Sequence, residues 1–350
     1  MTKKPFSLLL VVLASTLLIT SCGSAGGKSA NKNPAVVKNL YTNLSGGNGP
    51  ILVVKIDDTP PAHPQINLDK ADVVYIEQVE GGLSRIAALF SNPKTMPELV
   101  GPVRSARISD LDIFAQYGHI GFAFSGAQRL FYPKITAANL ENLSADREPA
   151  SIYSRDSTRQ EPTNLILHPK LLLTKSIETE KRLLALPKDP GWKFGKLPIG
   201  GVAITSASFK WPASKYSALW SASQKRWLLS YEGAPDLAAD GTQLGSPTLI
   251  IQKVSITDSI YHDKVGGITP FSQTVGSGTA YLLRDGRAIP IFWNRASAQV
   301  ATTWSLKDGS PAYFAPGQIW IALTDNDPVL TPVAQPAGQG SASASPTPKK

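Results

Sequence analysis

The chain of 350 residues contains a single cysteine, Cys22. No intramolecular disulfide can form, so each domain must draw its stability from a hydrophobic core. About 280 residues between positions 50 and 330 are available to build that core, which is long for one domain and sufficient for two. The sequence therefore predicts two domains without covalent cross-links.

The N-terminal segment has the pattern of an export signal. Lys3 and Lys4 precede an apolar run from residue 6 to residue 19 that carries no charge. This run is shorter than the roughly 20 residues of a membrane-spanning helix. The stretch 19–22 (Ile-Thr-Ser-Cys) resembles the bacterial lipobox, in which diacylglycerol is attached to the cysteine and the chain is cleaved before it. We therefore expect residues 1–21 to be a lipoprotein signal peptide.

A lipid on Cys22 would anchor the mature chain to the extracytoplasmic face of the cell membrane. Acyl chains contribute about 0.8 kcal/mol per buried methylene, and two or more chains hold a protein stably. A lipidated Cys22 could be neither a catalytic thiol nor a zinc ligand. The alternative is an ordinary cysteine near a signal cleavage site.

The charge of the chain indicates what kind of partner it meets. Residues 1–21 contain two lysines and no acidic residue, so their removal lowers the formal charge from +9 to +7. A basic protein outside the cell suits anionic envelope polymers or lipid headgroups. We expect no nucleic acid partner, because no dense Lys/Arg run with interleaved aromatic residues is present.

Low-complexity segments divide the chain into parts. Residues 22–49 are mostly small and polar, which predicts a flexible tether, and residues 329–350 are predicted to be a disordered tail. Between them we expect an N-terminal α/β domain over 50–195 and a mainly antiparallel β domain over 196–328. The predicted fold class is α+β.

Strands and helices are expected to alternate in the first domain. Strands are predicted over 51–57, 71–80, 83–90 and 119–125. Gly81-Gly82 suits the positive φ angles of a type I′ turn between the second and third of these. A helix is predicted from residue 111, with Ser109 or Asp110 as its N-cap. Helices and loops are expected over 139–190.

The second half is rich in short β-branched and aromatic runs. Strands are predicted over 201–204, 216–220, 227–231, 248–254, 279–283, 289–293 and 320–323. Turn signals separate them, including Asp285-Gly286 and Asp308-Gly309. Six of the seven tryptophans lie between residues 211 and 320. This pattern predicts a small antiparallel barrel or sandwich with an aromatic core.

Several motifs resemble those of the YerB-like lipoproteins, a family of bacterial domains without an assigned function. The matching motifs are Ala71-Asp-Val-Val-Tyr75, Glu80-Gly-Gly-Leu-Ser-Arg85, Gly101-Pro-Val-Arg-Ser-Ala-Arg107, Gly276-Ser-Gly278 with Tyr281, Arg284-Asp-Gly286, Trp293 and Pro316-Gly-Gln-Ile-Trp320. The chain departs from the family where Ala234-Pro235-Asp236 replaces a His-x-Asp motif. The resemblance covers residues 50–325 and implies a two-domain surface lipoprotein without implying a chemistry.

Candidate ligand-binding residues cluster around the predicted hairpin and the loop after it. They are Glu80, Arg85, Arg104, Ser105, Arg107 and Asp110. Two guanidinium groups on a loop that enters a helix would bind carboxylate or phosphate. The alternative is an internal salt-bridge network, for example between Arg104 and Glu80. We expect the chain to bind an anionic ligand or a protein in the cell envelope without catalysis.

The second hypothesis is a hydrolase or transferase that acts on envelope polymers, with Glu80 or Asp110 as acid or base. Other chemistries have weaker signals. The four histidines lack the spacing of a zinc site, and Ser125 lacks the first glycine of a nucleophile elbow. Neither Gly266-Gly267 nor the 276–278 stretch has the Lys-Ser/Thr of a phosphate-binding loop, and both are predicted to be turns. No metal and no cofactor are expected.

Overall fold

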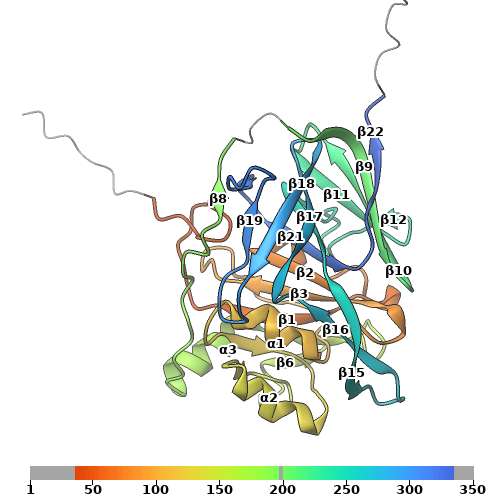
Figure 1. Ribbon diagram of the computed structural model, residues 1–350. Coiled ribbons are helices and arrows are strands. Elements are labelled where there is room, and N and C mark those ends of the chain that lie inside the picture. Colours follow the sequence, from red (N-terminus) through yellow and green to blue (C-terminus); the bar gives the residue numbers. More distant parts are fainter. Residues whose placement is uncertain (1–35, 197–199, 335–350) are drawn as a thin grey trace, which may run out of the picture. The chain divides into compact units, whose positions relative to one another are not determined.

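The computed structural model describes residues 36–196 and 200–334. Strands dominate this part of the chain, and its α-helices are short (Figure 1). The α-helices are α1 (Ile108–Ala115), α2 (Tyr132–Ala137) and α3 (Pro169–Thr174), which a π-turn extends over Lys175–Thr179. The predicted α+β class is confirmed. The signal peptide, Cys22 and residues 335–350 lie outside the described residues.

Sixteen strands form one hydrogen-bonded sheet. The N-terminal half provides β1 (Leu52–Asp57), β2 (Val73–Gln78), β3 (Ser84–Phe90), β4 (Gly121–Ala123) and β5 (Glu141–Asn142). The C-terminal half provides β9 (Val202–Trp211), β10 (Ser214–Ser221), β11 (Arg226–Tyr231), β12 (Ala234–Pro235), β13 (Gly245–Ser246), β14 (Thr248–Lys253), β17 (Gly276–Arg284), β18 (Arg287–Arg295), β19 (Thr303–Ser305), β21 (Ile319–Thr324) and β22 (Val329–Pro332). The halves meet where β2 pairs in parallel with β21.

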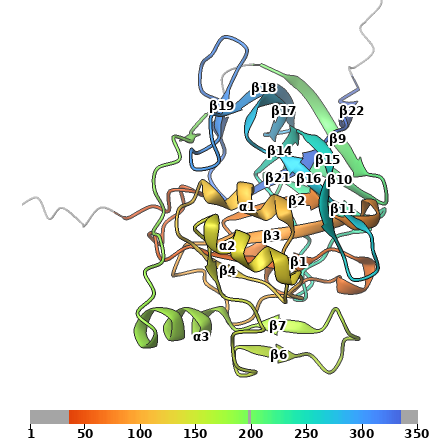
Figure 2. The same cartoon turned by 60° about the horizontal axis from the view of Figure 1, so that its bottom comes forward.

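The central strands are apolar on both faces because both faces are covered. Alternate side chains of β1 enter two different hydrophobic clusters. Leu52 and Val54 belong to the first cluster, and Val53 belongs to the second. Helices α1 and α2 add side chains to the second cluster, and Figure 2 shows both helices over the N-terminal strands. The small sheet of β6 (Tyr153–Arg155) and β7 (Leu165–Leu167) adds side chains to the first cluster.

The aromatic core predicted for the C-terminal half is present. Trp211, Tyr216 and Trp227 are buried in the same cluster as residues of β14 and β17. The indole nitrogen of Trp211 donates a hydrogen bond to the backbone of Leu323, at 2.7 Å. These strands do not form a separate barrel or sandwich, because β21 continues the sheet into the N-terminal half.

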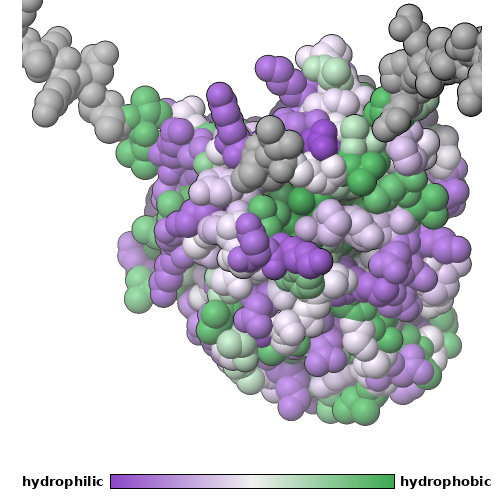
Figure 3. All heavy atoms as spheres, turned by 45° about the horizontal axis from the view of Figure 1, so that its top comes forward, coloured by the Kyte–Doolittle hydropathy of each residue, from purple (hydrophilic) through white to green (hydrophobic). Residues whose placement is uncertain are grey.

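Besides β6 and β7, two further pairs of strands in the described residues lie outside the main sheet. The hairpin of β15 (Ser255–His262) and β16 (Ile268–Gln273) extends from the C-terminal half and packs on α1 (Figure 1). The other pair joins β8 (Lys193–Phe194) to β20 (Tyr313–Phe314). Figure 3 shows small apolar patches separated by hydrophilic residues on one face, which is ordinary for a water-exposed surface.

Three local predictions were wrong. The predicted tether extends too far, because Asn39 and Tyr41 are already buried in the core. The predicted tail begins too early, because β22 pairs with β9. The glycine-containing stretch 276–278 belongs to β17 and is not a turn.

Candidate functional site

The buried face beneath α1 changes from apolar to charged at one end of three neighbouring strands. Lys55 and Asp57 lie at the end of β1, Glu77 lies near the end of β2, and Arg85 lies at the start of β3. Arg85 is opposite Asp57 in one strand pair and opposite Glu77 in the other. Because side chains alternate along a strand, all four point to the same face of the sheet.

Lys55 forms the centre of a closed network beneath the site. Its ammonium contacts the carboxylates of Glu77 and of Asp110, the latter at 2.7 Å, and the three side chains are almost fully buried. Burial and the nearby Asp110 raise the pKa of Glu77 to about 7, against the opposing effect of Lys55. The second oxygen of Asp110 accepts a hydrogen bond from the backbone of Arg107, at 2.6 Å. The N-cap of α1 is therefore Arg107, and the predicted caps at residues 109 and 110 were wrong.

Arg104 and Arg107 each contact one carboxylate. The Arg104 Nε atom lies 2.7 Å from Asp57 Oδ2, and the Arg107 Nε atom lies 2.7 Å from Glu80 Oε1. The predicted Arg104–Glu80 pair was therefore wrong in its partners, although an internal ion-pair network does exist. Both guanidinium groups remain partly exposed, at 27% for Arg104 and 14% for Arg107.

Arg85 differs from the other two arginines because it has no ion pair among the described residues. It is 6% exposed, and its side chain donates one hydrogen bond within the described residues, a long one from Nη1 to the Ser105 carbonyl, at 3.3 Å. Its Nε atom is buried without a partner. Burial and the charge of Arg107 lower the pKa of Arg85 to about 10, which still leaves it protonated at neutral pH. A buried cation with unused donors is costly unless an anion compensates it.

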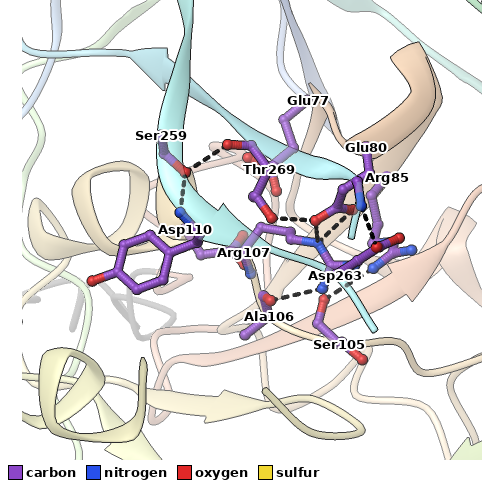
Figure 4. A network of polar contacts seen from close by, with 12 residues as sticks. Glu77, Glu80, Arg85, Ser105, Ala106, Arg107, Asp110, Ser259, Asp263 and Thr269 are labelled. Atoms are coloured by element: carbon purple, nitrogen blue, oxygen red, sulfur yellow. Dashed lines mark hydrogen bonds and ion pairs between the residues drawn. The ribbon is translucent and has the colours of Figure 1, made fainter. Parts of the chain in front are cut away.

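These arginines line a cavity of about 1060 Å³. Five of the six predicted binding residues contribute to its wall: Glu80, Arg85, Arg104, Ser105 and Arg107. Figure 4 shows four of them, all except Arg104, close together beside the β15–β16 hairpin. Asp110 lies beneath the cavity and does not line it. The site also includes residues that the sequence did not indicate, among them Asp146 and the hairpin residues 261–265.

The other candidate groups are engaged in local structure. Ser125 shares a hydrogen bond with Ser105, at 3.2 Å, and among the described residues it forms no hydrogen bond with a histidine. His63 lies between Asp58 and Asp236, and Asp57 accepts a turn hydrogen bond from Thr59. Within residues 36–196 and 200–334, no group of His, Cys, Asp or Glu side chains is arranged to hold a metal ion. No helix in the same ranges is long and apolar enough to cross a membrane.

The fold and motifs define an α+β protein of the DUF3048 family, to which this chain belongs. The family's N-terminal domain, described as a protein of unknown function, matches residues 40–182, and its C-terminal domain matches residues 206–321. Among relatives, "Putative lipoprotein YerB" of Bacillus subtilis (strain 168) is 38% identical over 92 residues. That stretch covers 26% of this chain and only 27% of the relative.

The structure also resembles the crystal structure of YerB from Bacillus subtilis. The TM-score is 0.69, and the match covers 83% of this chain and 97% of the other. Because the sequence identity over this match is 20%, the likeness shows the fold alone.

Proposed function

We propose that this chain is a membrane-anchored extracytoplasmic lipoprotein that binds an anionic group of an envelope polymer or protein in the arginine-lined cavity. The observation that carries this proposal is Arg85, a buried guanidinium with unused donors at the cavity wall. Asp57 pairs with Arg104 and Glu80 pairs with Arg107. Among the described residues, no carboxylate forms an ion pair with Arg85. Guanidinium groups bind carboxylate and phosphate in a bidentate manner, which suits this geometry.

An enzyme that acts on envelope polymers is the alternative, and the carboxylate positions give it little support. Asp110 is fully buried and contacts Lys55. Glu80 is 7% exposed, contacts Arg107 and accepts a hydrogen bond from Thr269. A general acid or base needs a proton-exchanging oxygen within reach of the substrate, and both carboxylates are already engaged.

Replacing Arg104 and Arg107 together by alanine should weaken binding to purified cell-wall polymers by at least tenfold. Each charge-assisted hydrogen bond contributes roughly 1.5–3 kcal/mol, and about 1.4 kcal/mol corresponds to a factor of ten. Co-sedimentation of the mature chain with the polymers measures this loss. Lys253→Ala, which removes an exposed lysine paired with Asp327, is the matched control and should bind normally. Unchanged binding by a folded double variant would place the site elsewhere.

A second prediction follows from the proposed lipid anchor on Cys22. Cys22→Ala should release the protein from the membrane fraction or leave it attached only through an uncleaved signal peptide, because no thiol remains to receive diacylglycerol. Metabolic labelling with a fatty acid analogue, followed by fractionation, measures both effects. An unlabelled wild-type protein, or an alanine variant that takes up as much label, would contradict the anchor.

A further inference from the structure

Three neighbouring chain segments form one wall of the arginine-lined cavity. The Arg104–Ala106 segment is bonded to the next through Ser125 N to Arg104 O, at 2.9 Å, and Ala106 N to Gly126 O, at 3.1 Å. That second segment is bonded to a third through Ala145 N to Phe124 O, at 2.9 Å. Neighbouring extended segments lie about 4.8 Å apart. The backbones of the arginine segment and of the third segment, which Asp146 follows, are thus separated by two such spacings, about 10 Å.

Asp146 provides a negative charge at the far end of this wall. Its side chain lines the same cavity and is exposed. One of its oxygens accepts a hydrogen bond from the Tyr132 hydroxyl, at 2.5 Å. No Lys, Arg or His of the described residues lies within ion-pair distance of it, whereas the neighbouring Glu148 contacts Lys175. The cavity therefore has an uncompensated cation at Arg85 and an uncompensated carboxylate at Asp146.

The wall between these two charges is made of small residues. Ser125, Gly126 and Ala127 line the cavity there. A Cβ atom added to Gly126 would lie 3.4 Å from Asp146 Oδ2, so this carboxylate is next to a position without a side chain. A ligand can therefore run along the wall from one charge to the other without meeting a bulky side chain.

We propose that the cavity binds a short peptide with free ends, with the carboxylate on Arg85 and Arg104 and the ammonium on Asp146. This proposal rests on the anion site of the proposed function and adds a binding position for a positive charge at Asp146. An extended chain spans about 3.3–3.6 Å per residue, so three residues reach across the wall, whose outer backbones are about 10 Å apart. A ligand with anionic groups throughout would meet repulsion at Asp146, which selects against uniform polyanions.

Both charged ends of the ligand can be tested by titration calorimetry. The full chain, purified in detergent, is titrated with chemically modified tripeptides. Trialanine with free ends should bind more tightly than N-acetyl-trialanine, by about fivefold, because acetylation removes the cation. It should bind more tightly than trialanine amide by about tenfold, because amidation removes the anion. Free dialanine should bind more weakly than trialanine because two residues, about 7 Å, do not reach across the wall.

Two variants assign each end of the peptide to its residue. Asp146→Asn should weaken the free peptide about fivefold and remove its advantage over the acetylated form. Arg104→Gln should reduce its advantage over the amide, because only Arg85 then remains to bind the carboxylate. Asp327→Asn, in an exposed ion pair with Lys253, is the control and should change neither comparison.

The possible failures are distinguishable. Equal affinity of free and acetylated peptide, or no peptide binding while arginine-dependent binding to cell-wall polymers persists, would overturn the peptide proposal and leave the anion site standing. If Arg104→Gln changes the binding of neither peptide nor polymer, the anion site and the peptide proposal both fail.

Discussion

Replacing Lys55 by methionine should lower the free energy of unfolding by about 3–5 kcal/mol. The substitution keeps an unbranched side chain, one heavy atom shorter, but removes the ammonium that contacts Glu77 and Asp110. Two carboxylates then remain buried without a compensating cation, and breaking a buried ion pair in this way has a cost of that size. Denaturant unfolding at neutral pH measures the change as a shift of the midpoint.

Two comparisons separate this electrostatic cost from the loss of packing. Lys253→Met removes a lysine whose ion pair with Asp327 is exposed, and it should cost less than about 1 kcal/mol. Without Lys55, which lowers the pKa of Glu77 to about 7, this pKa is higher in the variant, so the defect should shrink as the pH falls towards 7 and change little below it. Equal losses in the two variants, or a defect independent of pH, would contradict the role given to Lys55.

The sequence predicted strands and turns well because these depend on local patterns. Each of the seven strands expected in the second half is found. The glycines of the Glu80–Arg85 motif adopt positive φ angles, 68° for Gly81 and 73° for Gly82, as a tight turn requires. Asp285 and Gly286 also have positive φ angles, between β17 and β18. In these places the residue type alone decides the backbone conformation.

The pairing of charges could not be predicted in the same way. Lys55 and Asp110 are 55 positions apart, and only the packing of α1 on the sheet brings them together. The sequence indicated that Arg104 needs a partner. Asp57 is that partner because an isolated bridge pairs Ile56 of β1 with Val103 in the loop after β3. Five of the six candidates still line one cavity because they lie near one hairpin turn and the loop beside it.

The prediction made from composition was also wrong at the start of the folded region. The segment before residue 50 is polar enough to predict a tether, yet Asn39 donates a hydrogen bond to Ser91, at 2.9 Å, and is buried. Tyr41 packs edge-on against Tyr117, with ring centroids 5.3 Å apart. A buried aromatic residue and a satisfied amide thus help to hold this segment on the core.

A second buried charge cluster connects the two halves of the chain. His63 Nδ1 lies 2.9 Å from Asp236 and Nε2 lies 3.3 Å from Asp58. Its ring stacks on Tyr231, with centroids 4.2 Å apart. Tyr216 donates a further hydrogen bond to Asp58, at 2.6 Å. Asp58 and His63 belong to the N-terminal half, whereas the other three residues belong to the C-terminal half.

The stability of the protein should therefore fall at alkaline pH through His63. Burial alone would lower its pKa, but hydrogen bonds to Asp236 and Asp58 outweigh this effect and raise the pKa to about 10. A raised pKa stabilises the fold fully below the unfolded value of 6.5, and this stabilisation is lost as the pH rises through 10. At about 1.4 kcal/mol per pH unit, the loss is on the order of 5 kcal/mol. Urea unfolding between pH 6 and 10.5 should show this decline in the wild type and a much flatter profile in His63→Gln, and parallel profiles would exclude His63 as its source.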